Sequence, residues 1–176
     1  MTGYLKAGFL AGIVLFAWCF VSWTMLPWHT MTFRQFGSDV AVSQIIQANA
    51  TEPGVYMLPS MQQVQSAQRS GQEIKPVMFA SVSLVGPTSM TGPMLISLAS
   101  QIFAAFLVAW MLVRTSKLSY LGRVGFVLVF ALAATLIKDV PAWNWFGFDS
   151  FYTLVNIADT LVGWLLAGLV LARYAR

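Results

Sequence analysis

The chain has 176 residues, of which 58% are hydrophobic and 9% charged, and its net charge is +4. Soluble domains carry about 25% charged residues, so this composition excludes a soluble globular domain and indicates a single membrane domain over residues 1–176. No cluster of Lys and Arg with aromatic residues occurs, which argues against a nucleic-acid partner. The single cysteine, Cys19, excludes an internal disulfide and a two-cysteine redox motif within the chain.

Four apolar runs are long enough to cross a bilayer, which takes about 20 helical residues. They cover residues 7–27, 93–113, 121–138 and 151–172. Their residues do not alternate with a period of two, so we expect helices and not strands. The first run lacks a small-residue cleavage site, and Trp18 before Cys19 does not fit a lipoprotein signal, so we expect a retained helix. The predicted fold is an all-α, four-transmembrane-helix bundle.

Residues 29–92 lie between the first two runs and have a balanced charge. The stretch SDVAVSQIIQANA predicts a short helix capped by Ser38 or Asp39. GVYMLP and VMFASVSLV predict short strands, and the Gln-rich stretch between them predicts a loop or a solvated helix. The segment is too small for a generous core of its own. We therefore expect a small mixed α/β cap on the helix ends, acting as a spacer or as a recognition surface.

Basic residues gather on one side of the predicted membrane: Lys6, Arg114, Lys117, Arg123, Arg173 and Arg176. Such residues mark the cytoplasmic side. We therefore expect cytoplasmic N- and C-termini and an extracytoplasmic segment 29–92. An aromatic belt at the outer interface is expected from Trp23, Trp28, Trp143 and Trp145.

Asp159 lies well inside the fourth run, where an ionised carboxylate costs about 2.5–3.5 kcal/mol on insertion scales. Polar residues of all four runs fall at comparable depth in the outer half, so we expect Asp159 to face protein. The predicted intramembrane cluster consists of Asp159, Asn156, Lys138, Gln101, Thr135 and Ser22. Either Asp159 is protonated, or Lys138 and the amides of Asn156 and Gln101 stabilise its charge. The cluster then either fixes helix register or forms part of a proton or ion path.

Small residues predict where the helices pack together. Gly8 and Gly12 in "GFLAG" have the GxxxG spacing of helix contacts. Gly163 and Ala167 fall on the same helical stripe as Asp159.

Residues for catalysis, metal binding and cofactors are sparse. His29 is the only histidine, and with Met25 and Met31 it is the only candidate for a metal site, but the spacing shows no ligand cluster. Cys19 is the candidate nucleophile, at membrane depth, with no base beside it in the sequence. A phosphate-binding loop is absent and a membrane haem would lack a second histidine. We therefore expect no enzyme activity, no metal and no cofactor.

The strings "SWTMLPWH", "GVYMLP" and "NWFGFDSFYTLVNIADTLVGW" resemble those of small bacterial four-helix inner-membrane proteins, a family with no established activity. The resemblance covers nearly the whole chain and implies a bacterial inner membrane, without catalytic residues to transfer. We expect an accessory, scaffold or assembly subunit that contacts lipid and another membrane protein, or itself. The alternative is a small-solute or ion transporter that uses the polar site around Asp159.

Overall fold

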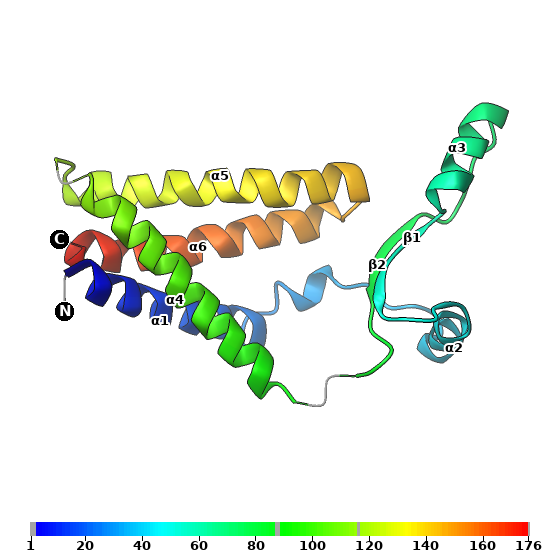
Figure 1. The fold of residues 1–176 in the computed structure, drawn as a ribbon, viewed down its shortest axis with the longest axis horizontal. Coiled ribbons are helices and arrows are strands. Elements are labelled where there is room, and N and C mark those ends of the chain that lie inside the picture. The colour runs from blue at the N-terminus through cyan, green and yellow to red at the C-terminus, as the bar shows by residue number, and fades with distance from the viewer. Residues whose placement is uncertain (1–2, 87–88, 116, 176) are drawn as a thin grey trace.

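A computed structural model describes residues 3–86, 89–115 and 117–175 (Figure 1). The elements follow in the order α1 (Gly3–Thr24), the 3-10 turn η1 (Thr30–Thr32), α2 (Asp39–Asn49), β1 (Gly54–Leu58), α3 (Met61–Ser70), β2 (Met78–Val82), α4 (Thr91–Val113), α5 (Tyr120–Phe146) and α6 (Ser150–Tyr174). Helices α1, α4, α5 and α6 are long and apolar enough to cross a membrane. The four predicted spans are therefore confirmed, and they are the helices expected of a multi-pass membrane protein.

The four long helices lie in the order α4, α1, α6, α5, because α1 packs against both α4 and α6 while α5 packs mainly on α6. Helix α4 crosses α1 obliquely and diverges from α5 toward the end of the bundle where residues 33–86 emerge (Figure 1). The core that joins the helices consists mostly of small and aliphatic residues: Ala7, Ala11, Leu15, Ala105, Val108, Ala109, Leu112, Val127, Ala167 and Leu171. Small side chains bring helix backbones close together where no water drives their association.

The GxxxG pair lies in the contact between α1 and α4. A β-carbon placed on Gly12 would lie 2.4 Å from the Cα atom of Ile102, and one on Gly8 would lie 2.2 Å from the ring of Phe106. No side chain fits at either distance, so α4 approaches α1 this closely because both positions are glycine.

Helix α5 is longer than the predicted third span, which ended at residue 138. It continues through Pro141 to Phe146 and ends where Gly147 adopts a left-handed conformation, with φ of +69°. Proline removes one backbone donor and strains the turn before it, but transmembrane helices tolerate it when neighbouring groups satisfy the backbone. Glycine then supplies the positive φ that ends the helix.

Residues 33–86, which we call the arm, contain the predicted secondary structure. Ser38 Oγ accepts a hydrogen bond from Ala41 N at 3.2 Å, which confirms Ser38 as the cap of α2. Strands β1 and β2 pair antiparallel, with Gly54 opposite Val82, so both predicted strands are confirmed. The Gln-rich linker forms α3, which Ser60 begins with a reciprocal capping box.

The arm projects away from the helix ends instead of resting on them as the predicted cap would (Figure 1). It meets the bundle where the ring of Phe79 in β2 lies 4.4 Å from that of Phe146 at the end of α5. All of residues 33–86 are described, and among them only Ala50, Pro59 and Ala67 are buried. The arm therefore has almost no core, because its larger apolar side chains are at most partly buried.

Candidate functional site

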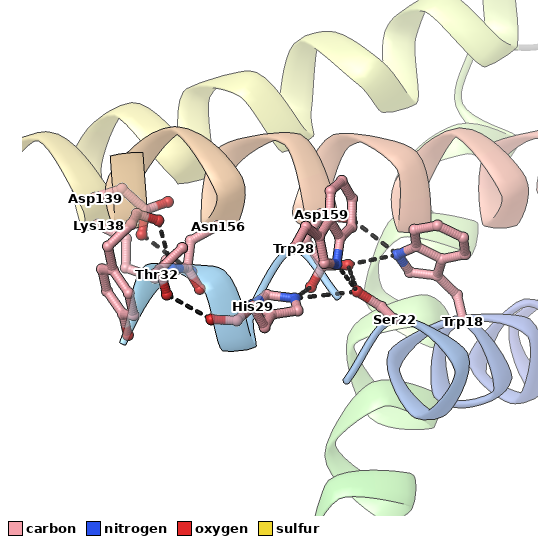
Figure 2. Close-up of polar contacts among 10 residues, drawn as sticks. Trp18, Ser22, Trp28, His29, Thr32, Lys138, Asp139, Asn156 and Asp159 are labelled. Carbon is pink, nitrogen blue, oxygen red and sulfur yellow. Dashed lines mark hydrogen bonds and ion pairs between the residues drawn. The ribbon is translucent and has the colours of Figure 1, made fainter. Parts of the chain in front are cut away.

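Asp159 on α6 accepts hydrogen bonds from two residues of α1 (Figure 2). The indole Nε1 of Trp18 donates to Asp159 Oδ1 at 2.7 Å, and the hydroxyl of Ser22 donates to the same oxygen at 2.6 Å. Trp18 Nε1 also lies 3.1 Å from the backbone oxygen of Asp159. Trp18 and Ser22 are one helical turn apart, so both side chains project from the face of α1 that packs on α6.

His29 completes the site because the chain folds back after α1. Its Nε2 atom lies 3.5 Å from Asp159 Oδ2 and 3.1 Å from Ser22 Oγ. The His29 side chain is 1% exposed, and the ring of Trp23 stacks on it with centroids 3.9 Å apart. The turn is held by Thr32, whose hydroxyl donates to the backbone oxygen of His29 at 2.6 Å.

Trp28 contributes the remaining donor. Its Nε1 atom donates to Ser22 Oγ at 3.0 Å, while Ser22 is 0% exposed. A serine hydroxyl has one proton and two lone pairs, and here the proton points to Asp159. The lone pairs are therefore available to Trp28 Nε1 and to a proton on His29 Nε2.

We call Trp18, Ser22, Trp28, His29 and Asp159 the clasp. The groups of the clasp that face one another are paired when His29 carries its proton on Nε2, an assignment that follows from the network, whereas His29 Nδ1 has no hydrogen-bond partner among the described residues. Trp18, Ser22 and His29 surround the carboxylate of Asp159, whose side chain is only 16% exposed. The hydrogen bonds of the clasp thus offset the free-energy cost of placing this acid in the membrane.

The presence of Ser22, His29 and Asp159 together does not make a nucleophilic triad. In such a triad the acid holds one imidazole nitrogen while the other nitrogen takes the serine proton. Here Ser22 and Asp159 both face Nε2, the serine proton points to the carboxylate, and His29 Nδ1 is buried with no hydrogen-bond partner in the described part of the chain. The arrangement fits a fixed contact between helices and does not fit acyl transfer.

Three of the predicted cluster residues, Asn156, Thr135 and Gln101, form no hydrogen bond with Asp159 within the described part of the chain. Asn156 Nδ2 donates to the backbone oxygen of Tyr152 at 2.8 Å. The hydroxyl of Thr135 donates to the backbone oxygen of Leu132, also at 2.8 Å. The Oε1 atom of Gln101 is buried without a hydrogen-bond partner in the described residues. Amides and hydroxyls in membrane helices readily bond to the preceding turn, which removes Asn156 and Thr135 from the carboxylate.

Lys138 also differs from the expectation that it stabilises Asp159. Its Nζ atom lies 3.4 Å from Oδ1 of the adjacent Asp139, and its side chain is 64% exposed. Asp139 is the residue that turns inward: it is buried, and its Oδ2 atom has no partner among the described residues. Figure 2 shows both residues toward the start of α6, away from Trp18. Successive helical residues point about 100° apart, so with Asp139 facing inward Lys138 turns outward.

The candidate metal residues do not converge. Met25 and Met31 are exposed, whereas His29 is buried and turned toward Asp159. No group of three or more His, Cys, Asp and Glu side chains within residues 3–86, 89–115 and 117–175 is placed to hold a metal ion.

The sequence analysis missed Trp18 and His29 as partners of Asp159, and Trp28 as a donor to Ser22. Trp18 has a detectable signal, because it lies one turn before Ser22 and its indole N–H must find an acceptor when buried. Trp28 and His29 follow the helix, and no periodicity predicts where a loop goes. Their position is a tertiary feature of the fold.

Gly163 makes room for the clasp. Gly163 lies on α6 one helical turn beyond Asp159, and a β-carbon placed on it would lie 2.9 Å from Cδ1 of Trp18. From Gly163 toward the C-terminal end of α6, the residues buried between α1 and α6 are apolar: Leu15, Ala11, Ala167 and Leu171. The clasp is thus closed toward the end of the bundle opposite the arm.

Comparison of the chain with protein-family models, with curated proteins and with solved structures finds no match.

Proposed function

We propose that this chain is a noncatalytic accessory or assembly subunit of the bacterial inner membrane, which binds another membrane protein through its arm. The observation that carries this proposal is an arm rich in exposed apolar side chains and almost without a core. In residues 33–86, exposed large apolar residues include Phe36, Val40, Ile45, Val55, Val77 and Val85. Apolar surface that a protein leaves uncovered marks contact sites with other molecules.

The helix faces are less suited to this role than the arm. Gly8 and Gly12 contact α4, and Gly163 contacts Trp18, so the small-residue stripes are occupied within the chain. Ala167 is fully buried in the same core. These small residues already contact other helices of the same chain, so they are not available to a partner helix, which favours the arm as the binding surface.

The charge distribution supports an extracytoplasmic arm with both termini in the cytoplasm. The start of α1 and the end of α6 lie at the end of the bundle opposite the arm (Figure 1). At that end Lys6 lies 5.5 Å from the ring centroid of Tyr174, and Arg114 stacks on Trp110 at 3.6 Å. Arg123 donates to the backbone oxygens of Ala172 and Ala175 at the end of α6. Basic residues favour the cytoplasmic side of the membrane.

The clasp serves the arm in this proposal. It ties the chain that leaves α1 to α6 through His29, and the arm begins four residues later. The contact fixes where the arm starts relative to the bundle. Buried polar contacts of this kind can specify one arrangement of packed elements.

Replacement of the arm tests the proposal. In one variant a short Gly/Ser linker replaces residues 39–82, so that the clasp and all four long helices remain. The tagged wild-type chain, purified gently from native membranes, should retain a second membrane protein in stoichiometric amount, and the variant should lose it. A variant that folds and keeps the same partner would contradict the proposal.

A proton or ion transporter is the second candidate, favoured by the buried His29 beside Asp159 and by the Oδ2 atom of Asp139, which has no hydrogen-bond partner among the described residues. Next to the clasp, toward the end of the bundle opposite the arm, lies a core of apolar residues such as Leu15, Ala167 and Leu171, which disfavours such a path. Flux into vesicles that contain the purified protein, compared for wild type and Asp159→Asn, separates the two candidates. We expect no flux that depends on Asp159.

A further inference from the structure

A pocket of about 190 Å³ lies between the start of α5 and the end of α6. The described residues that line it are Leu118, Tyr120, Arg123, Ala172 and Arg173. It is at the end of the bundle opposite the arm, where α5 begins and α6 ends (Figure 1). Two of its five described lining residues are arginines, so the pocket carries positive charge.

Hydrogen bonds between the two helices hold the pocket in shape. The guanidinium of Arg123 donates to the backbone oxygens of Ala172 and Ala175, which fixes its charge at the end of α6. The hydroxyl of Tyr120 donates to another backbone oxygen of α6 at 3.2 Å. Arg173 is exposed, and its side chain forms no hydrogen bond or ion pair with another residue in the described part of the chain. One arginine is thus fixed in place, and the other is open to a ligand.

This end of the bundle has basic side chains but no acidic ones. Aromatic rings contact two of the basic groups, because Lys6 lies over Tyr174 and Arg114 stacks on Trp110. The six acidic residues of the chain lie in the arm or in the halves of α5 and α6 nearest the arm, together with the turn that joins those helices: Asp39, Glu52, Glu73, Asp139, Asp149 and Asp159. No Asp or Glu side chain therefore balances the charge of the pocket, which is complementary to an anion from outside.

The pocket lies where the helix ends meet lipid headgroups. Helix α5 begins at Tyr120 and α6 ends at Tyr174, and both helices are long and apolar enough to cross a membrane. Tyr and Trp are enriched at the level of the headgroups, and Tyr120 lines the pocket itself. Arg side chains near helix ends extend to the same level. The anion that surrounds the pocket at this depth is the phosphate of a phospholipid.

We propose that the pocket binds the headgroup of an anionic phospholipid, with the phosphate between Arg123 and Arg173. A guanidinium binds phosphate oxygens through paired N–H donors. A zwitterionic headgroup also carries a cation beside its phosphate. Both arginines repel that cation, and no carboxylate among the described lining residues can receive it. The inference is independent of the proposed function, and it holds in either orientation because the pocket lies at a membrane surface in both.

Native mass spectrometry of the full-length chain tests the inference. The chain is placed in nanodiscs that contain phosphatidylglycerol and phosphatidylcholine in equal parts, and the lipids that remain bound after release are identified. We expect the wild-type chain to retain phosphatidylglycerol in preference to phosphatidylcholine. Arg173→Gln should lower that retention at least about tenfold, which corresponds to about 1.4 kcal/mol, because a charge-assisted contact to the phosphate is lost.

Lys117→Gln is the matched control. It removes the same charge from the same end of the bundle, but Lys117 is exposed in the loop and does not line the pocket. Its retention of phosphatidylglycerol should stay within about twofold of wild type, a difference of under about 0.5 kcal/mol. Arg173→Lys keeps the charge but loses the paired donors, so its retention should lie between those of wild type and Arg173→Gln. Thermal unfolding of each variant shows that the fold is kept, as expected for substitutions at exposed positions.

Two outcomes overturn the inference. Equal retention of both lipids, or an equal loss in Arg173→Gln and Lys117→Gln, would show a general attraction of this end of the bundle to negative surfaces and no site. Competition separates a lipid from a soluble anion, since excess inorganic phosphate should not displace the retained phosphatidylglycerol, whose acyl chains also contact the helices. Displacement by phosphate would assign the pocket to a soluble anion. Neither outcome depends on whether the arm binds a partner.

Discussion

The indole of Trp18 on α1 donates a hydrogen bond to the carboxylate of Asp159 on α6, at 2.7 Å, while its ring lies over Gly163 one turn further along. One side chain thus satisfies an acid in the membrane and also sets the approach of two helices. The clasp combines hydrogen bonds to Asp159 with close packing of Trp18 on Gly163. Substitutions can perturb the hydrogen bonds and the packing separately.

Asp159→Asn should lower the free energy of unfolding by about 1–3 kcal/mol. The asparagine amide replaces one acceptor oxygen with an NH₂ donor. That donor must face either Trp18 and Ser22 or else His29, and all three of these residues donate hydrogen bonds at this site. Unfolding in mixed micelles measures the loss. Glu52→Gln, which changes an exposed arm carboxylate in the same way, should change stability by less than about 0.5 kcal/mol. Equal stability of the two variants would contradict the clasp.

His29 should contribute to the stability of the fold in two ways, through the stacking of its ring on Trp23 and through the contact of its Nε2 atom with Asp159. His29→Phe keeps an aromatic ring against Trp23 but removes the contact with Asp159, whereas His29→Ala removes both, so the alanine variant should be the less stable. A double-mutant cycle of His29→Phe with Asp159→Asn should give a coupling energy of about 0.5–3 kcal/mol. Additive effects of the two substitutions would show that His29 and Asp159 do not interact.

Gly163→Ala should destabilise the protein by about 1–3 kcal/mol, because the new methyl group overpacks the site at Trp18. Gly125→Ala is the matched control on α5, since a β-carbon there has no neighbour within 4 Å. Alanine is favoured over glycine inside a helix by about 0.5–1 kcal/mol, so the control should be neutral or more stable. Thermal unfolding in detergent compares the two, and the same sign of change in both would contradict the packing described.

The proposed orientation predicts which side of the membrane each loop occupies. In a Cys19→Ser background, a membrane-impermeant maleimide added to intact cells, under conditions that open the outer membrane, should label Gln65→Cys in the arm. It should not label Lys117→Cys in the loop between α4 and α5 until the inner membrane is disrupted. The reverse pattern would place the arm in the cytoplasm.

Much of the fold follows from local sequence patterns. Apolar runs predict the four spans, period-two patterns predict β1 and β2, and Ser38 predicts the start of α2, because each depends on neighbours in the chain. The extension of α5 through Pro141 did not follow from the sequence, since proline ordinarily ends a helix. The projecting arm was also missed, because the sequence of residues 33–86 does not state what they pack against.

The candidate site was predictable only in part. Periodicity indicates that Asp159 faces protein, and the depth of Ser22 places it among the cluster residues. His29 reaches the carboxylate of Asp159, and Trp28 reaches Ser22, through the turn that follows α1, and no sequence periodicity predicts the path of that turn. Lys138 was expected to stabilise Asp159 because opposite charges attract, but it pairs with the adjacent Asp139 and its side chain is exposed.

The most direct measurement of the central claim is native mass spectrometry of the tagged wild-type chain, extracted from its own membranes into lipid nanodiscs without detergent. The accessory role predicts a complex of this chain with a different membrane protein at a fixed ratio, which dissociates in the arm-replaced variant. A chain that always appears alone, as a monomer, would contradict it.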